Sequence, residues 1–320
     1  MAAGRGLHRF AVLTASATLA LIFAGGLVTS TGSGLAVPDW PLSYGQLMPP
    51  MVGGVAIEHG HRMAAATVGL LMLVLAIWIF RKEPRRWVGR LAALALLAVV
   101  LQGLLGGLTV LLLLPPGVSV AHACLAQAFL CLTVSLAVVT GGKWAAQDQR
   151  TAIIPSPALR RLAIALPIAV YLQLVLGAIM RHTHAGLAIP DFPLSFGRLV
   201  PPLWSFPIAI HFAHRVWGIA VAALAAACAL RARRETLKGA SAGIVGPAML
   251  VVALVGGQIL LGGTIVWTSR AVLPTTLHVA MGAAILAASL IGALHCERRA
   301  RAGRAVSRHA AAPLAAGQTA

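Results

Sequence analysis

The chain has 320 residues, of which 59% are hydrophobic and 10% are charged, and its mean hydropathy is +0.89. About a quarter of the residues in a soluble domain are charged, so this composition excludes an ordinary soluble protein and predicts an integral membrane protein. The formal net charge is +18. This charge does not indicate binding to nucleic acid, because the basic residues cluster between apolar stretches, as they do in cytoplasmic loops of membrane proteins.

Apolar stretches of about 20 residues, the length that crosses about 30 Å of hydrocarbon, predict an all-α, polytopic membrane protein with eight transmembrane helices. The first stretch follows Arg5 and Arg9 as a cleaved signal peptide would. It matches the fifth stretch in an internal repeat, so we count it as a helix. The expected helices lie near 10–30, 58–80, 91–113, 119–140, 161–181, 208–230, 243–267 and 273–294.

The two halves of the chain repeat one another. The segment GLAVPDWPLSYG at 34–45 returns as GLAIPDFPLSFG at 186–197, and a duplication of this kind constrains the architecture. Each half holds four expected helices, so both halves enter the membrane in the same direction. We therefore expect two tandem four-helix bundles related by a pseudo-two-fold axis along the membrane normal.

We assign residues 1–150 to an N-terminal half, 151–297 to a C-terminal half and 298–320 to a basic tail. The tail is rich in arginine, alanine and glycine, and we expect it to be disordered. Most of the 25 lysines and arginines lie at the N-terminus, in the tail, or in the segments after the second, fourth and sixth helices. Such segments are usually cytoplasmic, which places both termini in the cytoplasm and the repeated loops on the outer side.

Four histidines occupy matching places near the outer ends of the second, fourth, sixth and eighth helices. Because facing helices of a bundle direct side chains into a common core, His61 with His122, and His214 with His278, can each bind a flat metallocofactor from both faces. Haem is the natural candidate, since imidazole is a common axial ligand of its iron. A single histidine at a helix end is often only an interfacial residue, but four at matching positions favour a ligand set.

Arg62 and Arg215 directly follow the first histidine of each pair. A guanidinium at this depth can bind a haem propionate or extend to the lipid headgroups. Glu58 lies three residues before His61, on the same helix face, whereas the second half has His211 at the matching position. A carboxyl group in an apolar pocket can exchange protons near neutral pH, so we expect the first half to react and the second half to hold a cofactor.

A second repeated block lies on the third and seventh helices, where Gln102 and Gly106–Gly107 recur as Gln258 and Gly262–Gly263. The glycine pairs permit the close approach of a helix or a flat ring. The glutamines are intramembrane polar groups that we expect to bond across helices.

Other outer histidines carry weaker signals. His59 has no counterpart in the second half, and His182 and His184 form a His-x-His motif. This motif fits either a small metal site or a loop at the membrane interface, and the interface is the commoner setting. The proline- and aromatic-containing loops at 34–45 and 186–197 are expected to lie over the bundle mouths, as lids or as simple connectors.

In a set of residues from both halves, the chain resembles haem A synthase, the membrane enzyme that converts haem O to haem A for terminal oxidases. The resemblance covers about residues 10–295, and its combination of motifs is specific. The set comprises Glu58, His61, Arg62, His122, His214, Arg215 and His278.

The resemblance implies a division of roles between the halves. It implies that His214 and His278 bind a haem b cofactor, that His61 and His122 bind the substrate haem O, and that Glu58 is essential to turnover. The implied reaction oxidises one porphyrin methyl group to a formyl group by two hydroxylations and loss of water from the gem-diol. Several family members carry a cysteine pair in the first outer loop, and this chain has none between residues 31 and 57, so a mechanism that relies on the pair is in doubt.

The resemblance also implies a location and partners. The absence of an N-terminal transit segment favours a bacterial plasma membrane over a mitochondrial one. The implied partners are haem O, haem O synthase, oxidase assembly factors, an electron acceptor and further copies of the chain, besides the lipid bilayer.

Two other classes of function remain open. A dihaem electron carrier linked to quinol would use the same four histidines, but it has no use for a single acid beside one ring. A transporter built from parallel repeats would need polar groups at the membrane midplane, whereas those of this chain cluster at the outer end. The pigment of the purified protein separates these classes.

Overall fold

The computed structural model describes residues 4–142, 144, 154–237 and 245–311, which form long helices and contain no strand. Eight of these helices are long and apolar enough to cross a membrane. This confirms the predicted all-α architecture, with the first apolar stretch as one of the eight. The helices are α1 (Arg5–Ser30), α2 (Gly53–Lys82), α3 (Arg86–Leu111), α4 (Pro116–Thr140), α6 (Pro157–His182), α7 (Phe206–Leu237), α8 (Val245–Trp267) and α9 (Val272–Ala311), with a short 3-10 helix, η1 (Ala185–Leu187).

Local sequence signals fix some of the helix starts. Pro116 and Pro157 stand in the first turns of α4 and α6, where the missing N–H of proline has no helical partner to lose. The hydroxyl of Ser156 accepts a hydrogen bond from the Leu159 N–H at 3.2 Å and so caps α6. Large apolar residues such as Leu70 and Ile219 remain exposed along the helices, as expected of side chains that face lipid.

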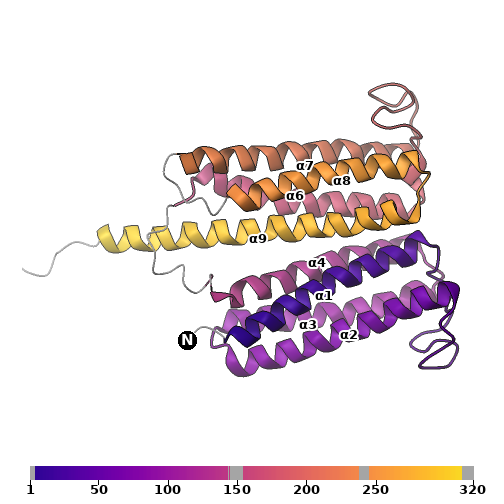
Figure 1. Cartoon of the computed structure of the whole chain (residues 1–320), viewed down its shortest axis with the longest axis horizontal. Helices are drawn as coiled ribbons and strands as arrows, with labels where there is room; N and C mark the ends of the chain where they lie inside the picture. The colour runs from indigo at the N-terminus through magenta and orange to yellow at the C-terminus, as the bar shows by residue number, and fades with distance from the viewer. Residues whose placement is uncertain (1–3, 143, 145–153, 238–244, 312–320) are drawn as a thin grey trace, which may run out of the picture.

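The helices form two groups that lie side by side, α1–α4 and α6–α9 (Figure 1). Within the first group α1 packs against α2 and α4, and α3 packs against α2 and α4. The second group repeats this pattern with α6, α7, α9 and α8. The groups meet where α1 contacts α9, α4 contacts α6 and α4 contacts α9. If α1 is exchanged with its counterpart α6, and α4 with its counterpart α9, the same set of contacts results. The symmetry axis itself stays a prediction, which this pairing supports.

Apolar side chains fill the junction between the groups. Ile22, Leu130, Val134 and Ala283 form a buried cluster from α1, α4 and α9. One polar contact lies at the loop end of the same junction, where Arg181 of α6 donates to the Gly26 carbonyl at 2.9 Å and to the Ser30 hydroxyl at 2.8 Å on α1. The halves are thus joined mainly by apolar packing.

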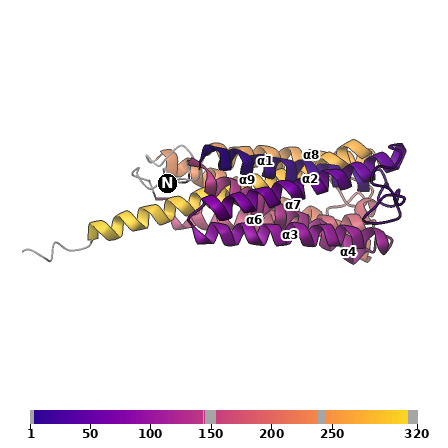
Figure 2. The same cartoon turned by 90° about the horizontal axis from the view of Figure 1, so that it is seen from below.

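The two repeated loops, 31–52 and 183–205, lie at the same end of the molecule, and the start of α1 lies at the other end (Figures 1 and 2). The short turn between α2 and α3 lies at the end opposite the loops, and there Arg85 pairs with Glu83 at 2.7 Å. Arg85 also donates to the Val139 carbonyl at 3.0 Å, which links this turn to α4. The common placement of the loops agrees with the predicted direction of the halves.

The structure differs from the expectation of a disordered tail that begins at residue 298. Helix α9 continues through residue 298 to Ala311, and residues 312–320 lie outside the described part of the chain. Alanine and arginine are strong helix formers, and Arg301 pairs with Glu297 one turn earlier at 2.9 Å. Glu297 also binds Arg160 at the start of α6, so this part of α9 is anchored to the bundle.

Candidate functional site

His214 on α7 and His278 on α9 face one another near the loop end of the second half. Their ring centroids are 6.3 Å apart, with an angle of 55° between the ring planes. Two metal–imidazole bonds of about 2 Å each, plus the inset of each nitrogen from its ring centre, add up to about 6 Å. The rings therefore have the separation that one metal atom held between them requires.

The first half places His61 on α2 and His122 on α4. The two rings lie within electrostatic range of one another. In all four histidines the ring atom Nδ1 is buried and has no hydrogen-bond partner among the described residues. A buried polar nitrogen normally has a partner, so four such atoms at matching positions fit sites that receive a ligand.

A glycine on a neighbouring helix faces each of the four rings. A Cβ atom would lie 3.1 Å from the ring Cε1 atom at three of these glycines and 3.4 Å from it at the fourth. Any side chain there would crowd the histidine, so the glycines form a cradle for the rings. The pairs are Gly25 with His61, Gly106 with His122, Gly177 with His214 and Gly262 with His278.

Two of these glycines were not singled out from the sequence. Gly25 on α1 and Gly177 on α6 are 152 residues apart, the offset of the repeated loops. The signal that could have found them is this offset, applied to the helices that precede the loops.

Glutamines from neighbouring helices donate to the histidine carbonyl groups. The amide nitrogen lies 2.9 to 3.1 Å from the carbonyl oxygen, and in two of three cases it is also 3.3 Å from the ring Nε2. This confirms the expectation that the intramembrane glutamines bond across helices. The pairs are Gln102 with His122, Gln173 with His214 and Gln258 with His278.

The second glycine of each predicted pair receives a ring from the repeated loop. A Cβ on Gly107 would lie 2.6 Å from the Trp40 ring, and one on Gly263 would lie 2.9 Å from the Phe192 ring. The glycine pairs thus admit flat rings on both sides: a histidine at the first glycine and a loop aromatic at the second. Each loop is packed onto its own bundle next to the histidine site.

A half-exposed aspartate organises each loop. Asp39 accepts hydrogen bonds from the Tyr44 and Gly45 N–H groups at 2.7 and 2.8 Å, and Asp191 does the same in the second half. The bond from Gly45, followed by that from Tyr44, holds the pKa of Asp39 below its usual value. The same donors in the second loop, led by Gly197, lower the pKa of Asp191. Both loops are therefore held in one shape by ionised carboxylates.

Arg62 and Arg215 turn into the loops. Arg62 donates to the carbonyl oxygens of Val37, Asp39 and Leu42 at 2.7 to 3.0 Å. Arg215 likewise donates to loop carbonyls, at 2.8 and 3.3 Å. The propionate contact expected for these arginines stays a prediction, and a propionate would have to share the guanidinium groups with these carbonyls.

Glu58 is 3% exposed, and both of its oxygens are engaged. Oε2 accepts from the Val37 N–H at 2.8 Å, and Oε1 accepts from Arg62 at 2.6 Å. His211 occupies the same place in the second half, with Arg215 donating to its Nε2 at 3.1 Å. Glu58 therefore fastens the loop to α2, and the halves differ here in charge while sharing the geometry.

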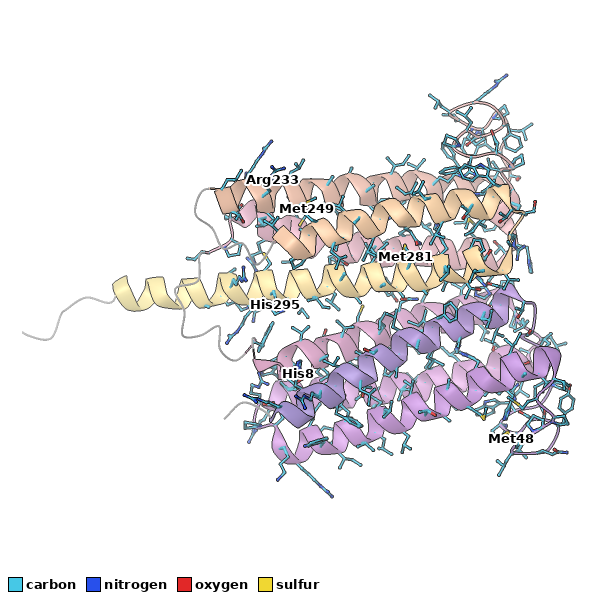
Figure 3. All side chains as sticks on the ribbon, viewed as in Figure 1. His8, Met48, Arg233, Met249, Met281 and His295 are labelled. Atoms are coloured by element: carbon cyan, nitrogen blue, oxygen red, sulfur yellow. The ribbon has the colours of Figure 1, made fainter. Side chains whose placement is uncertain are left out.

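The remaining outer histidines show no metal cluster. His59 is hydrogen-bonded through Nδ1 to the Ser43 hydroxyl at 2.8 Å, and His184 precedes η1 in a left-handed conformation. Within the described residues no group of three or more His, Cys, Asp or Glu side chains could hold a metal ion. His8 and His295 lie at the end opposite the loops (Figure 3). The residues that meet at matching sites are thus the four histidines named from the sequence.

The chain matches the COX15–CtaA family, described as cytochrome oxidase assembly protein, over residues 8–53 and 54–290. It is 35% identical to the haem A synthase of Halalkalibacterium halodurans over 222 residues, which cover 67% of this chain and 72% of that protein. It is 35% identical to the haem A synthase of Symbiobacterium thermophilum over 243 residues, 72% of this chain and 77% of that protein. The haem A synthase of Geobacillus kaustophilus is 29% identical over 300 residues, which cover 91% of this chain and 90% of the relative.

Proposed function

The chain belongs to the COX15–CtaA family, and from this premise we propose that it is an oxidoreductase that converts haem O to haem A. The reaction turns one porphyrin methyl group into a formyl group through two hydroxylations and loss of water. The observation that carries the proposal is the repeated pair of histidines in glycine cradles, whose rings face one another at 6.3 Å in the second half. Two such sites suit a substrate haem and a resident haem.

The C-terminal half, residues 151–297, is the cofactor half in this proposal. His214 and His278 would hold haem b between them, which the 6.3 Å separation of their rings supports. A haem b bound there would supply one-electron redox chemistry. Gly177 and Gly262 keep the two rings free of side-chain contacts that would turn them away.

The N-terminal half, residues 1–150, is the substrate half. His61 and His122 bind the iron of haem O, and the Trp40 ring covers the α3 side of the site next to the Gly106 cradle. A loop that covers the site in this way would shield the reacting methyl group from bulk water. Arg62 fixes the loop that forms this cover.

Glu58 is the proposed proton-handling residue. Its carboxylate leaves α2 on the face that carries His61, three residues later. When water supplies the oxygen, each hydroxylation of the methyl group passes two electrons to the electron acceptor and releases two protons, and a carboxylate can accept one of these protons at Oε1 or Oε2. The bonds from Arg62 and the Val37 N–H hold those two oxygens in place for this task.

The membrane placement completes the proposal. The chain is a multi-pass membrane protein, and we place it in a bacterial plasma membrane with both termini in the cytoplasm. The distribution of lysine and arginine supports this direction, and it puts both haem sites near the outer face. Haem O synthase, oxidase assembly factors and other copies of the chain are the proposed protein partners.

Expression in a bacterium that makes haem O but has no haem A synthase tests the function. Haems extracted from the membranes are separated by reversed-phase chromatography. We expect a haem A peak with the natural chain and none with the double variant His61→Ala/His122→Ala. A protein that purifies with two haem b groups and yields no haem A would be a dihaem electron carrier, and a colourless protein would favour transport.

A further inference from the structure

Three of the four histidines are tied to a neighbouring helix by the glutamine contacts described above, and His61 is the exception. The repeat pairs α1 with α6, and its offset of 152 places Leu21 where α6 has Gln173. Leu21 packs against the apolar core of the first half. In the described part of the chain, the His61 carbonyl therefore has no side-chain donor from α1 to match the bond that Gln173 makes to His214.

A second difference accompanies the first. A Cβ on Gly218 of α7 would lie 3.3 Å from the amide nitrogen of Gln173, closer than most such contacts. At the position that matches Gly218, one turn after His61, α2 carries Ala65. The second half thus has both the glutamine and the space for its amide, and the first half has neither.

The glutamine bond fixes the backbone of the residue that would bind iron. Residues that orient a metal ligand typically change metal affinity about 10–100-fold. A ligand on a helix that is tied to its neighbour is held ready to bind. A ligand on a helix segment that lacks this hydrogen bond can move away from the iron at a lower cost in free energy.

We propose that His61 is the exchangeable axial ligand, and that the pair Leu21 and Ala65 is the feature that lets the first-half haem enter and leave. His122, held by Gln102, stays as the fixed ligand of the same haem. The second half, clamped on both sides by Gln173 and Gln258, retains its haem. The inference rests on the proposed function, in which the first half exchanges substrate for product.

A graft of the second-half features tests the proposal in the full-length protein. Leu21→Gln combined with Ala65→Gly introduces the clamp, and Leu21→Met at the same place is the matched control without an amide. The exchange in the other direction, Gln173→Leu with Gly218→Ala, removes the clamp from the second half. The probe is haem b, loaded into both halves of the detergent-solubilised protein, with excess apomyoglobin as the acceptor of released haem.

Haem transfer, followed by visible absorbance, should show a fast and a slow phase in the natural chain. The fast phase should be missing in His61→Ala, which assigns it to the first half. The graft should slow the fast phase about tenfold and leave the slow phase unchanged, whereas Leu21→Met should alter neither. The graft should also narrow the low-spin electron paramagnetic resonance signal of the first-half haem, because its ligand has fewer orientations.

Two results would overturn the inference. A fast phase that keeps its rate in the graft, together with a slow phase that keeps its rate in the Gln173→Leu/Gly218→Ala variant, would show that the glutamines do not control exchange. The proposed function would survive that result if haem O is still converted. If the fast phase is missing in His214→Ala instead, the division of roles between the halves is wrong. Should the graft fail to fold, the second-half variant alone decides, with an accelerated slow phase as the expected result.

Discussion

Replacement of Glu58 separates its two possible roles, because the second half shows what a neutral residue does at the same place. Glu58 accepts hydrogen bonds from Arg62 and from the Val37 N–H. Glu58→Gln keeps the size of the side chain and removes its charge. Glu58→His copies His211, whose Nε2 accepts from Arg215 at 3.1 Å. The Ile189 N–H also points at His211 Nδ1, at 3.3 Å. A neutral imidazole accepts at one nitrogen only, so the histidine variant keeps one of the two contacts, to the arginine or to the loop N–H.

The expected magnitudes differ for stability and for turnover. A hydrogen bond to a charged group contributes about 1.5–3 kcal/mol, and Glu58→Ala should lower the free energy of unfolding by about that amount. Glu58→Gln and Glu58→His each keep one acceptor and should lose less. General acid–base catalysis contributes about 10²–10⁴-fold, so Glu58→Gln, which cannot titrate, should form haem A at least about 100-fold more slowly. Glu58→His can transfer a proton through its imidazole and should lose less activity than Glu58→Gln. Glu58→Asp, which keeps the acid, should retain part of the activity.

The assay is the ratio of haem A to haem O in membranes that contain equal amounts of each variant, with thermal unfolding of the purified protein measured in parallel. Haem b absorbance should be unchanged in all four variants, because Glu58 contacts the first-half loop. If Glu58→Gln, which has no titrating group, formed haem A at the natural rate, fastening the loop would be the whole role of Glu58 and the proton-handling proposal would be refuted.

Three further predictions follow from the site and its loops. Gly25→Ala or Gly106→Ala places a Cβ 3.1 Å from a histidine ring and should reduce the amount of haem bound by the first half. Gly103→Ala is the control, because Gly103 lies on the same helix as Gly106 but faces open space. The haem content per protein molecule measures the loss. Cysteines introduced at Leu47 and Leu199, which are both 83% exposed in the loops, should react with an impermeant thiol reagent in spheroplasts. A cysteine at Leu237, which is 79% exposed at the opposite end of the molecule, should stay protected. The reverse pattern would show that the loops face the cytoplasm. The folded pKa of Asp39 and Asp191 is lowered, so their loop bonds are present above the ordinary value of 3.8 and are lost as the pH falls through the lower folded value. Hydrogen exchange of the Tyr44 and Phe196 amides, which donate to these carboxylates, should therefore accelerate beyond its intrinsic pH dependence only below about pH 4; an acceleration near neutral pH would contradict this.

The sequence predicted the features that depend on pattern and repetition. The eight spans follow from hydropathy, since the bilayer imposes their length, and the facing histidines follow from the duplication. Helix packing brings residues of one depth together, which is why His214 and His278 could be paired before the geometry was known. For the glycine pairs the sequence allowed either a helix or a flat ring to approach closely, and the structure places rings there.

The partners of the polar groups could not be predicted in the same way. Arg62 and Glu58 bind loop atoms whose positions depend on the path of the loop, and no periodic pattern describes that path. Gln173 was missed because the matching position in the first half holds Leu21, so a search for residues that recur in both halves does not find it. The extension of α9 past residue 298 depends on local helix propensity and on the anchor at Glu297, which a composition argument about disorder overlooks.

The division of roles between the halves is tested most directly by the haem b absorbance of the purified protein in four single variants. His214→Ala and His278→Ala should each remove most of the haem b signal, because each breaks the pair whose rings are 6.3 Å apart. His61→Ala and His122→Ala should spare most of that signal and abolish haem A formation. An equal loss of haem b from all four variants, or a loss confined to His61→Ala and His122→Ala, would contradict a resident cofactor in the second half.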